Sequence, residues 1–372
     1  MTGAAPQVRP DYRRRTLDFL RSCVSSPLNM VLTAAVVIMA LVAIPGLVRW
    51  LLVEAVWTGT SGKDCIGHDG ACWIFLRAHA DQLLYGSYPA GERWRLAAAA
   101  CIGIATVVAI GAGRRQLRLV SIVVMLVAAS IVIGVLMVGG VEGLPYVPTS
   151  RWGGILLTVV IATWTIVTAL PIGLLLALAR QSELPVISVI AATFIDLARS
   201  LPLVGLLFLL IVMFPLFVPP GVEADKLIRA LIAFTIFNAA NFAEVFRGGL
   251  QAIHRSQIEG GYSLGLPKWR VTALVVIPQV VAVSLPGVIN IAIAIVKETT
   301  IVLILGLFDF IGVLQSGMSD PEWLMSESVR TTAYVFASMV FWAICFSLSR
   351  YGVAIERRLS RTGAGRGAGF VA

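Results

Sequence analysis

Long apolar runs dominate this chain and constrain its fold more than any other feature of the sequence. A helix needs about 20 consecutive apolar residues to cross a bilayer, and runs of that kind recur along most of the chain. Charged residues make up only 13% of the 372 residues, whereas about 25% is usual in soluble domains. The sequence therefore predicts an all-α polytopic membrane protein, because helices satisfy their own backbone groups within lipid.

The apolar runs predict about eight transmembrane helices. Their expected ranges are 28–52, 96–112, 119–138, 155–179, 184–217, 227–245, 271–296 and 332–348. We expect a division near residue 150, because the five later runs hold nearly all the polar residues that fall inside apolar runs. Residues 1–150 would comprise a cytoplasmic segment, three helices and a long periplasmic loop. Residues 151–356 would form a second transmembrane domain, and residues 357–372 a cytoplasmic tail.

Basic residues gather in alternate breaks between the apolar runs and predict how the chain is oriented. Loops rich in lysine and arginine stay in the cytoplasm, and with eight crossings all the basic breaks fall on one side. Their main basic residues are Arg9, Arg13, Arg14, Arg15, Arg21, Arg114, Arg115, Arg118, Arg180, Arg247, Arg255, Lys268, Arg270, Arg350, Arg357, Arg358, Arg361 and Arg366. We therefore expect cytoplasmic N- and C-termini, and we attribute the net charge of +9 to membrane orientation rather than to nucleic-acid binding.

A hydrophilic segment, 247–270, separates the sixth and seventh apolar runs on the predicted cytoplasmic side. Within it, Ser256 and Glu259 have the spacing of a helix capping box. Gly265 fits a left-handed helix end, and Pro267 prevents the helix from continuing. The segment therefore predicts an exposed helix of about two turns.

Two glycines, Gly260 and Gly261, stand in the middle of this expected helix, where each costs about 1 kcal/mol of helix propensity relative to alanine. Small residues let the backbone of another protein approach closely, which suits a helix that docks into a groove of a separate chain. An ordinary capped turn between two crossings explains the same residues, because capping boxes are common.

Several motifs around this segment resemble the membrane subunits of bacterial ABC importers. The run Glu259-Gly260-Gly261, followed by Gly265, resembles their EAA loop, although the family pattern has two alanines in place of the two glycines. The preceding residues, 243–253, resemble the polar amino acid branch of the family. Two further elements resemble short motifs of that branch: Arg199-Ser200-Leu201-Pro202-Leu203 and Lys297-Glu298-Thr299-Thr300. The resemblance covers about residues 152–355, and Ala71-Cys72-Trp73 in the N-terminal part resembles the general L-amino acid permeases.

This resemblance implies a type I ABC importer core of five helices in the C-terminal part. It implies a permease subunit that translocates L-amino acids across the inner membrane, together with a cytoplasmic ATP-binding subunit dimer, a second homologous permease subunit and a periplasmic amino acid-binding protein. The segment 247–270 would be the coupling loop: Glu259 would bond within the docked helix, and Gly260, Gly261 and Leu264 would fill the ATPase groove. Because the sequence has no phosphate-binding loop, ATP and Mg would bind on the partner ATPase, and this chain would be a transport subunit without a cofactor.

Charged residues inside the apolar runs are further functional candidates, because they are costly in lipid and usually face a cavity or a partner. Lys297 and Glu298 end one apolar run, and the short run 301–307 that follows predicts a broken or re-entrant helix. We expect Lys297, Glu298 and Thr299 to line or gate a path, with Asn290 as a weaker candidate; a pair anchored at the interface without substrate contact explains them equally well. Asp196 and Arg199, three residues apart on a helix, predict a structural ion pair.

Two cysteines, Cys65 and Cys72, share the long loop and could form a disulfide if that loop is periplasmic; two reduced thiols are the alternative. The three histidines, His68, His79 and His254, share no ligand spacing, so we predict no metal site.

Two other classes of function stay open at this point. An ion-gradient-driven secondary transporter of small polar solutes would also carry intramembrane charges and a broken helix, but it does not explain a docking helix with small residues. A membrane scaffold or enzyme is disfavoured, because the sequence offers no catalytic triad or carboxylate pair and places polar residues inside the bundle.

Overall fold

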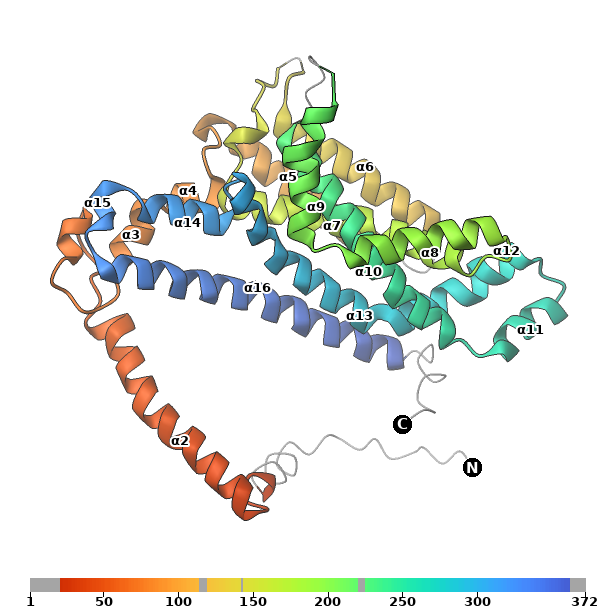
Figure 1. Ribbon diagram of the computed structural model, residues 1–372, viewed down its shortest axis with the longest axis horizontal. Coiled ribbons are helices and arrows are strands. Elements are labelled where there is room, and N and C mark those ends of the chain that lie inside the picture. The colour runs from red at the N-terminus through yellow and green to blue at the C-terminus, as the bar shows by residue number, and fades with distance from the viewer. Residues whose placement is uncertain (1–20, 114–118, 142, 220–224, 362–372) are drawn as a thin grey trace. The chain divides into compact units, whose positions relative to one another are not determined.

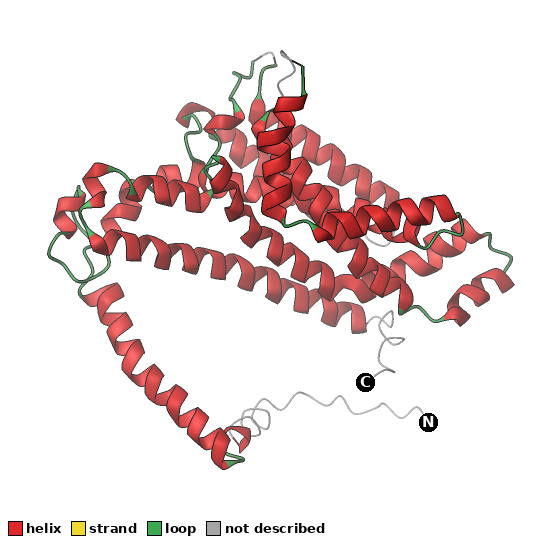
Figure 2. Ribbon diagram, viewed as in Figure 1, coloured by secondary structure: helices red, strands yellow, loops and turns green. Residues whose placement is uncertain are grey.

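The computed structural model describes residues 21–113, 119–141, 143–219 and 225–361 (Figure 1). These residues form helices joined by turns and loops, and they contain no β-strand (Figure 2). The basic segments at 1–20, 114–118 and 362–372, which entered the prediction of orientation, lie outside the described residues. The all-helical class that the apolar runs predict is confirmed.

Helices cover every apolar run of the sequence. The elements that correspond to these runs are α2 (Pro27–Val48) with η1 (Arg49–Val53), α5 (Trp94–Gly113), α6 (Leu119–Val138), α7 (Gly154–Arg180), α8 (Pro185–Ser200), α9 (Leu203–Phe208) with η5 (Leu209–Met213) and η6 (Phe214–Phe217), α10 (Lys226–Gln251), η7 (Thr272–Val276) with α13 (Ile277–Glu298), and α16 (Glu327–Arg361). The shorter elements between them are η2 (Gly62–Cys65), α3 (Trp73–Ala78), α4 (Ala80–Tyr85), η3 (Ala90–Glu92), η4 (Thr149–Arg151), α11 (Arg255–Ser263), α12 (Lys268–Val271), η8 (Thr299–Leu305), α14 (Phe310–Met318) and α15 (Pro321–Leu324).

Six stretches of helix within the described residues are long and apolar enough to cross a membrane. They are Pro27–Val53, Ala90–Gly113, Gly154–Arg180, Lys226–Gln251, Lys268–Leu305 and Glu327–Arg357. The predicted third crossing is the 20-residue helix α6, of which the described stretch Val124–Val138 is apolar but shorter than the six above. The predicted fifth crossing, 184–217, is not a single straight helix, so the structure supports six crossings, or seven if this bent pair spans the membrane once.

The fifth predicted crossing breaks at Leu201 and Pro202, where α8 and the helix beginning at Leu203 are bent by 100°. Pro202 carries no amide hydrogen and disfavours a helical conformation of the residue before it. Leu201 is accordingly extended, with φ −87° and ψ 138°. The bend therefore follows directly from one proline inside an apolar run.

Contacts divide the chain into two compact units, Met1–Arg77 with Pro321–Thr332, and Ala78–Asp320 with Ala333–Ala372. This division differs from the boundary near residue 150 that the distribution of polar residues predicts. Helices α5 and α6 belong to the second unit, together with the five runs that follow them.

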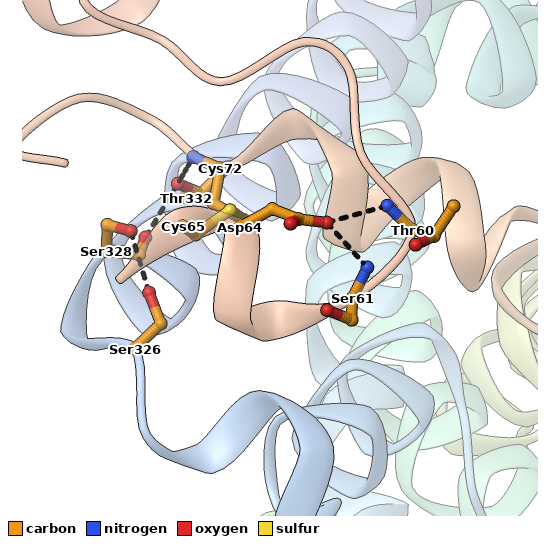
Figure 3. The surroundings of a disulfide bond; sticks show 8 residues. All are labelled: Thr60, Ser61, Asp64, Cys65, Cys72, Ser326, Ser328 and Thr332. Carbon is orange, nitrogen blue, oxygen red and sulfur yellow. Dashed lines mark hydrogen bonds between the residues drawn. A yellow bond between two sulfur atoms is a disulfide. The ribbon is translucent and has the colours of Figure 1, made fainter. Parts of the chain in front are cut away.

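The first unit is held together around a disulfide between Cys65 and Cys72 (Figure 3). The amide of Cys72 donates a hydrogen bond to the hydroxyl of Thr332 at 2.8 Å. Nearby, the carboxylate of Asp64 accepts hydrogen bonds from the amides of Thr60 and Ser61, and these lower its pKa. The bond from Cys72 to Thr332 links the loop after α2 to the start of α16, whereas the Asp64 bonds stay within that loop.

The second unit is organised around the close contact of α7 with α10. Gly173 on α7 makes this contact, because a Cβ atom at that position would lie 2.8 Å from the carbonyl oxygen of Ala239. Around the pair, buried apolar residues form two clusters, one containing Leu157 and Phe234, the other containing Phe242 and Ile295. Helices α8 and α13 pack on α10 as well, so α10 carries contacts from most of the unit into the loop that follows it.

Candidate functional site

The hydrophilic segment after α10 forms the exposed helix α11, which lies with α12 at one end of the second unit (Figure 1). His254, not Ser256, is the first cap: its Nδ1 accepts a hydrogen bond from the Ser256 amide at 3.3 Å and lies 2.8 Å from the Ser256 hydroxyl. The predicted capping box is therefore wrong. Nδ1 of His254 accepts the free amide of the first turn, that of Ser256. The helix begins at Arg255, so Glu259 lies in its second turn.

The end of α11 follows the sequence prediction. Gly265 is left-handed, with φ +75°, and its amide donates to the carbonyl of Tyr262 at 2.8 Å. The amide of Leu266 donates to the carbonyl of Gly261 at 3.3 Å, which completes a Schellman ending. Pro267 is extended and caps α12. The helix thus has a defined end that does not depend on a partner.

The two central glycines of α11 face in different directions. Gly260 is open, with no atom within 4 Å of where a Cβ would stand. Gly261 is buried, and its Cβ would lie 2.9 Å from Cγ2 of Val271 on α12. The expectation that both glycines face a partner is therefore wrong for Gly261, whose small size lets α11 pack onto α12.

Apolar side chains of the loop point into solvent. Leu264 is 81% exposed, Trp269 is 66% exposed and Tyr262 is 45% exposed, while the guanidinium of Arg270 lies 5.0 Å from the ring centre of Trp269. Large exposed apolar groups on an otherwise hydrophilic segment are typical of a surface that binds another protein.

A surface ion pair joins this loop to the turn between α7 and α8. The Lys268 ammonium lies 2.7 Å from both carboxylate oxygens of Glu183. This hydrogen bond lowers the pKa of the Glu183 carboxyl. Both side chains are exposed, so the pair positions the loop only weakly.

Five charged side chains meet where α7, α8 and α10 approach one another. Asp196 lies 3.1 Å from Arg180, and Glu244 lies within 3.7 Å of both Arg180 and Arg199 and bonds Arg247 on its own helix. The predicted pair between Asp196 and Arg199 is therefore wrong, because Arg199 turns toward α10 and Asp196 toward the end of α7. The spacing in the sequence predicts that Asp196 and Arg199 pair with each other, but in the packed helices each lies closer to a charged residue of another helix.

The second charged region lies where α13 ends. Lys297 is exposed, Glu298 is partly buried and faces Asn238 on α10, and Asn290 is exposed. Thr299 is fully buried, and its hydroxyl donates to the Val296 carbonyl at 2.9 Å, so this side chain serves the helix rather than an open path. The 3-10 turn η8 continues directly from α13, and Lys268–Leu305 counts as one helical stretch, so the structure does not show the separate broken or re-entrant helix that the short apolar run predicts.

Two buried charged residues, Asp309 and Arg95, were not predicted from the sequence. Asp309 is fully buried and caps α14 by accepting the Gly312 amide at 3.0 Å, and burial raises the pKa of its carboxyl to about 6. Arg95 is also fully buried, and its guanidinium donates to the Pro145 carbonyl at 2.9 Å. Arg95 also pairs with Glu92, three residues earlier, at 2.8 Å. An aspartate directly before an apolar helix and an acid three residues before an arginine are local signals that the sequence offers, whereas the carbonyl that Arg95 binds lies 50 residues away.

The described residues contain no cluster of three or more His, Cys, Asp or Glu side chains that could hold a metal ion.

Residues 169–361, more than half of the chain, match the family model described as binding-protein-dependent transport system inner membrane component. The chain belongs to this family. As an inner-membrane transport component it is a multi-pass permease of the ABC importer class, which agrees with its six candidate spans. This membership favours the importer interpretation over a secondary transporter or a scaffold.

Relatives of this permease cover nearly its whole length. It is 39% identical over 336 residues to the Escherichia coli inner membrane amino-acid ABC transporter permease protein YhdY, which covers 90% of each chain. It is 30% identical over 423 residues to the Rhodobacter capsulatus glutamate/glutamine/aspartate/asparagine transport system permease protein BztC, which covers 96% of each. A crystal structure of an amino acid ABC transporter with histidines is similar at a TM-score of 0.49 and 25% identity, over 55% of this chain and 92% of that one.

Proposed function

We propose that this permease is the membrane-spanning subunit of an ATP-driven importer of L-amino acids, with both of its termini in the cytoplasm. Support comes from its family and from two relatives that are named as amino-acid transport permeases. Each of these relatives aligns with this chain over at least 90% of its own length. A periplasmic amino acid-binding protein delivers the substrate, a second homologous permease subunit completes the pathway, and a cytoplasmic ATPase dimer binds ATP and Mg.

The observation that carries this proposal is the exposed apolar edge of the loop around α11. The helix is capped at both ends by its own residues, and Gly261 anchors it on Val271. Leu264 and Trp269 nevertheless remain in solvent. A loop that is ordered by its own contacts and still exposes these groups is suited to dock into a separate protein, and we assign the ATPase as that protein.

Substrate passes the charged region at the end of α13 in this proposal. Lys297 and Glu298 offer one charge of each sign, which matches the carboxylate and the ammonium of a zwitterionic amino acid. Glu298 also faces Asn238 on α10, the helix that leads to the coupling loop. Lys297, Glu298 and Asn290 are therefore our candidates for the path.

The test is co-purification and uptake with Leu264→Asp. A carboxylate at a docked apolar position opposes binding, and loss of a central interface contact costs about 2 kcal/mol or more, so we expect the ATPase to dissociate and ATP-driven uptake to fall by about tenfold or more. The membrane level of the permease should not change, because Leu264 is 81% exposed.

The matched control is Ile66→Asp, an equally drastic change at a 51% exposed residue of the first unit. It should leave both the bound ATPase and uptake at wild-type values. Full ATPase binding and uptake by a well-expressed Leu264→Asp variant would contradict the docking role. Uptake that persists without ATP and collapses with the ion gradient would contradict the proposed energy source.

A further inference from the structure

The carboxylate of Glu244 lies between arginines from two other helices. Its Oε1 accepts a hydrogen bond from Nε of Arg247, one turn along α10, at 2.9 Å. Its Oε2 lies 3.7 Å from Nη1 of Arg180 and 3.7 Å from Nη1 of Arg199. One oxygen is therefore fixed within α10, and the other faces two guanidinium groups at equal distances.

The two longer contacts of Glu244 are unlike the other ion pairs of the cluster. A separation of 3.7 Å is too long for a hydrogen bond, although it is close enough for strong attraction at a partly buried site. The Glu244 side chain is only 23% exposed. Arg180 already has a closer partner in Asp196, at 3.1 Å. The Oε2 atom is thus attracted to two positions and bonded at neither.

Three helices, α7, α8 and α10, meet at Glu244. Arg180 is the last residue of α7, and Arg199 lies in the last turn of α8, just before the 100° bend at Leu201 and Pro202. Glu244 lies two turns before the end of α10, which continues through His254 into α11. The Glu244 carboxylate therefore connects α10, which precedes the loop around α11, with the C-terminal end of α8, which precedes the bend.

We propose that Glu244 is a positioning residue that transmits movement of α11 to the bend between α8 and α9. In one state of the transporter Oε2 closes onto Arg199, and in the other it closes onto Arg180, while Arg247 keeps Oε1 in place. The inference rests on the proposed function, because it assigns α11 as the element that the ATPase moves. A fixed ion network would stabilise the bundle equally but would not alter how ATP hydrolysis is linked to transport.

The experiment measures ATP hydrolysed per amino acid imported, with the complete wild-type complex in proteoliposomes as the reference. The variants are Glu244→Gln, Arg199→Gln and the double variant, and the matched control is Glu54→Gln, which removes the acid of an exposed ion pair with Arg49 in the first unit. We expect Glu244→Gln to keep the ATPase bound while ATP consumed per substrate rises by about fivefold or more. The double variant should be no worse than the stronger single variant, because both act through one contact.

Proportional loss of hydrolysis and uptake in Glu244→Gln, with an unchanged ratio, would overturn the inference in favour of a fixed network. Should Glu244→Gln fold poorly, Glu244→Asp keeps the charge but shortens the reach by one methylene, and the same increase in the ratio is expected. A wild-type ratio in Glu244→Asp would also overturn the inference. Wild-type complexes that bind no ATPase would instead contradict the proposed function, so the two failures are distinguishable.

Discussion

Two breaks in α-helix, the loop between α10 and α12 and the passage from α13 into the 3-10 turn η8, present opposite kinds of side chain. Between α10 and α12, in a hydrophilic segment, the structure exposes Leu264 and Trp269. At the end of α13, within an apolar stretch that is long enough to span a membrane, it places the charged residues Lys297 and Glu298. The first break puts apolar groups in water, and the second puts charges in an apolar span.

Each of these arrangements is unfavourable for the isolated chain, and this shared cost indicates function. Apolar groups in water favour contact with another protein, whereas charges in a span favour a polar path or a charged ligand. The comparison therefore separates the two roles that we propose, docking at the first break (the outer break) and substrate handling at the second (the inner break). Variants at the outer break that release the ATPase, and variants at the inner break that impair substrate transport while the ATPase stays bound, would support this division of roles. Variants at the inner break that also release the ATPase would contradict it.

The largest effect is expected for Lys297→Met at the inner break. If Lys297 lines the proposed path, its removal leaves the substrate carboxylate without a partner, which costs about 2 kcal/mol or more, so uptake should fall by about tenfold or more. The ATPase should remain bound, in contrast to Leu264→Asp. Uptake assays with co-purification check both parts, and unchanged uptake would show that Lys297 only anchors the helix at the interface.

A smaller effect is expected when each central glycine of α11 is replaced by valine. Gly261→Val adds a side chain that collides with Val271, and overpacking of this kind costs about 1–3 kcal/mol. Gly260→Val enters open space and should leave the helix intact. Limited proteolysis of the loop should therefore accelerate only for Gly261→Val. Equal cleavage of both variants would contradict the inward placement of Gly261.

A pH effect is expected at Asp309, which follows the inner break. Burial raises the pKa of its carboxyl from 3.8 to about 6, so the fold favours the protonated form. This stabilisation is fully present below pH 3.8 and is lost as the pH rises through about 6. The Tm of the purified permease should fall over this range, and the Asp309→Asn variant should show a flatter pH profile. Identical profiles for both proteins would contradict the assignment.

The smallest effect is expected for Glu183→Gln, which removes the exposed pair with Lys268. Exposed pairs contribute little, so uptake should stay within about twofold of wild type. Because the Glu183 pKa is lowered on folding, the pair contributes above the unfolded pKa of this group and is lost as pH falls through the folded value. A loss of coupling comparable to that of Leu264→Asp would show that this pair, rather than the apolar edge, holds the loop.

Local signals in the sequence predicted local structure well. The end of α11 depends on Gly265 and Pro267, which act through their own backbone, and its position follows from those two residues. The bend at Leu201 has an equally local cause in Pro202, although the surrounding apolar run masks that signal. The start of α11 was mispredicted because a histidine ring, rather than a serine hydroxyl, accepts the first amide.

Contacts between distant segments were beyond the reach of sequence spacing. Asp196 and Arg199 satisfy the rule for a helical pair, yet α7 and α10 offer them Arg180 and Glu244 instead. The inward placement of Gly261 likewise depends on how α12 packs against α11. Which side chains of the predicted site face one another therefore required the folded chain, and the roles of these residues stay predictions.

Cross-linking at Leu264 tests the central claim most directly. In a chain whose free cysteines, Cys23, Cys101 and Cys345, are replaced by serine, Leu264→Cys should form a cross-link to the cytoplasmic ATPase with a short bifunctional reagent. Ile66→Cys in the first unit should form none. A Leu264→Cys complex that transports amino acids at the wild-type rate but yields no cross-link to the ATPase would contradict the account.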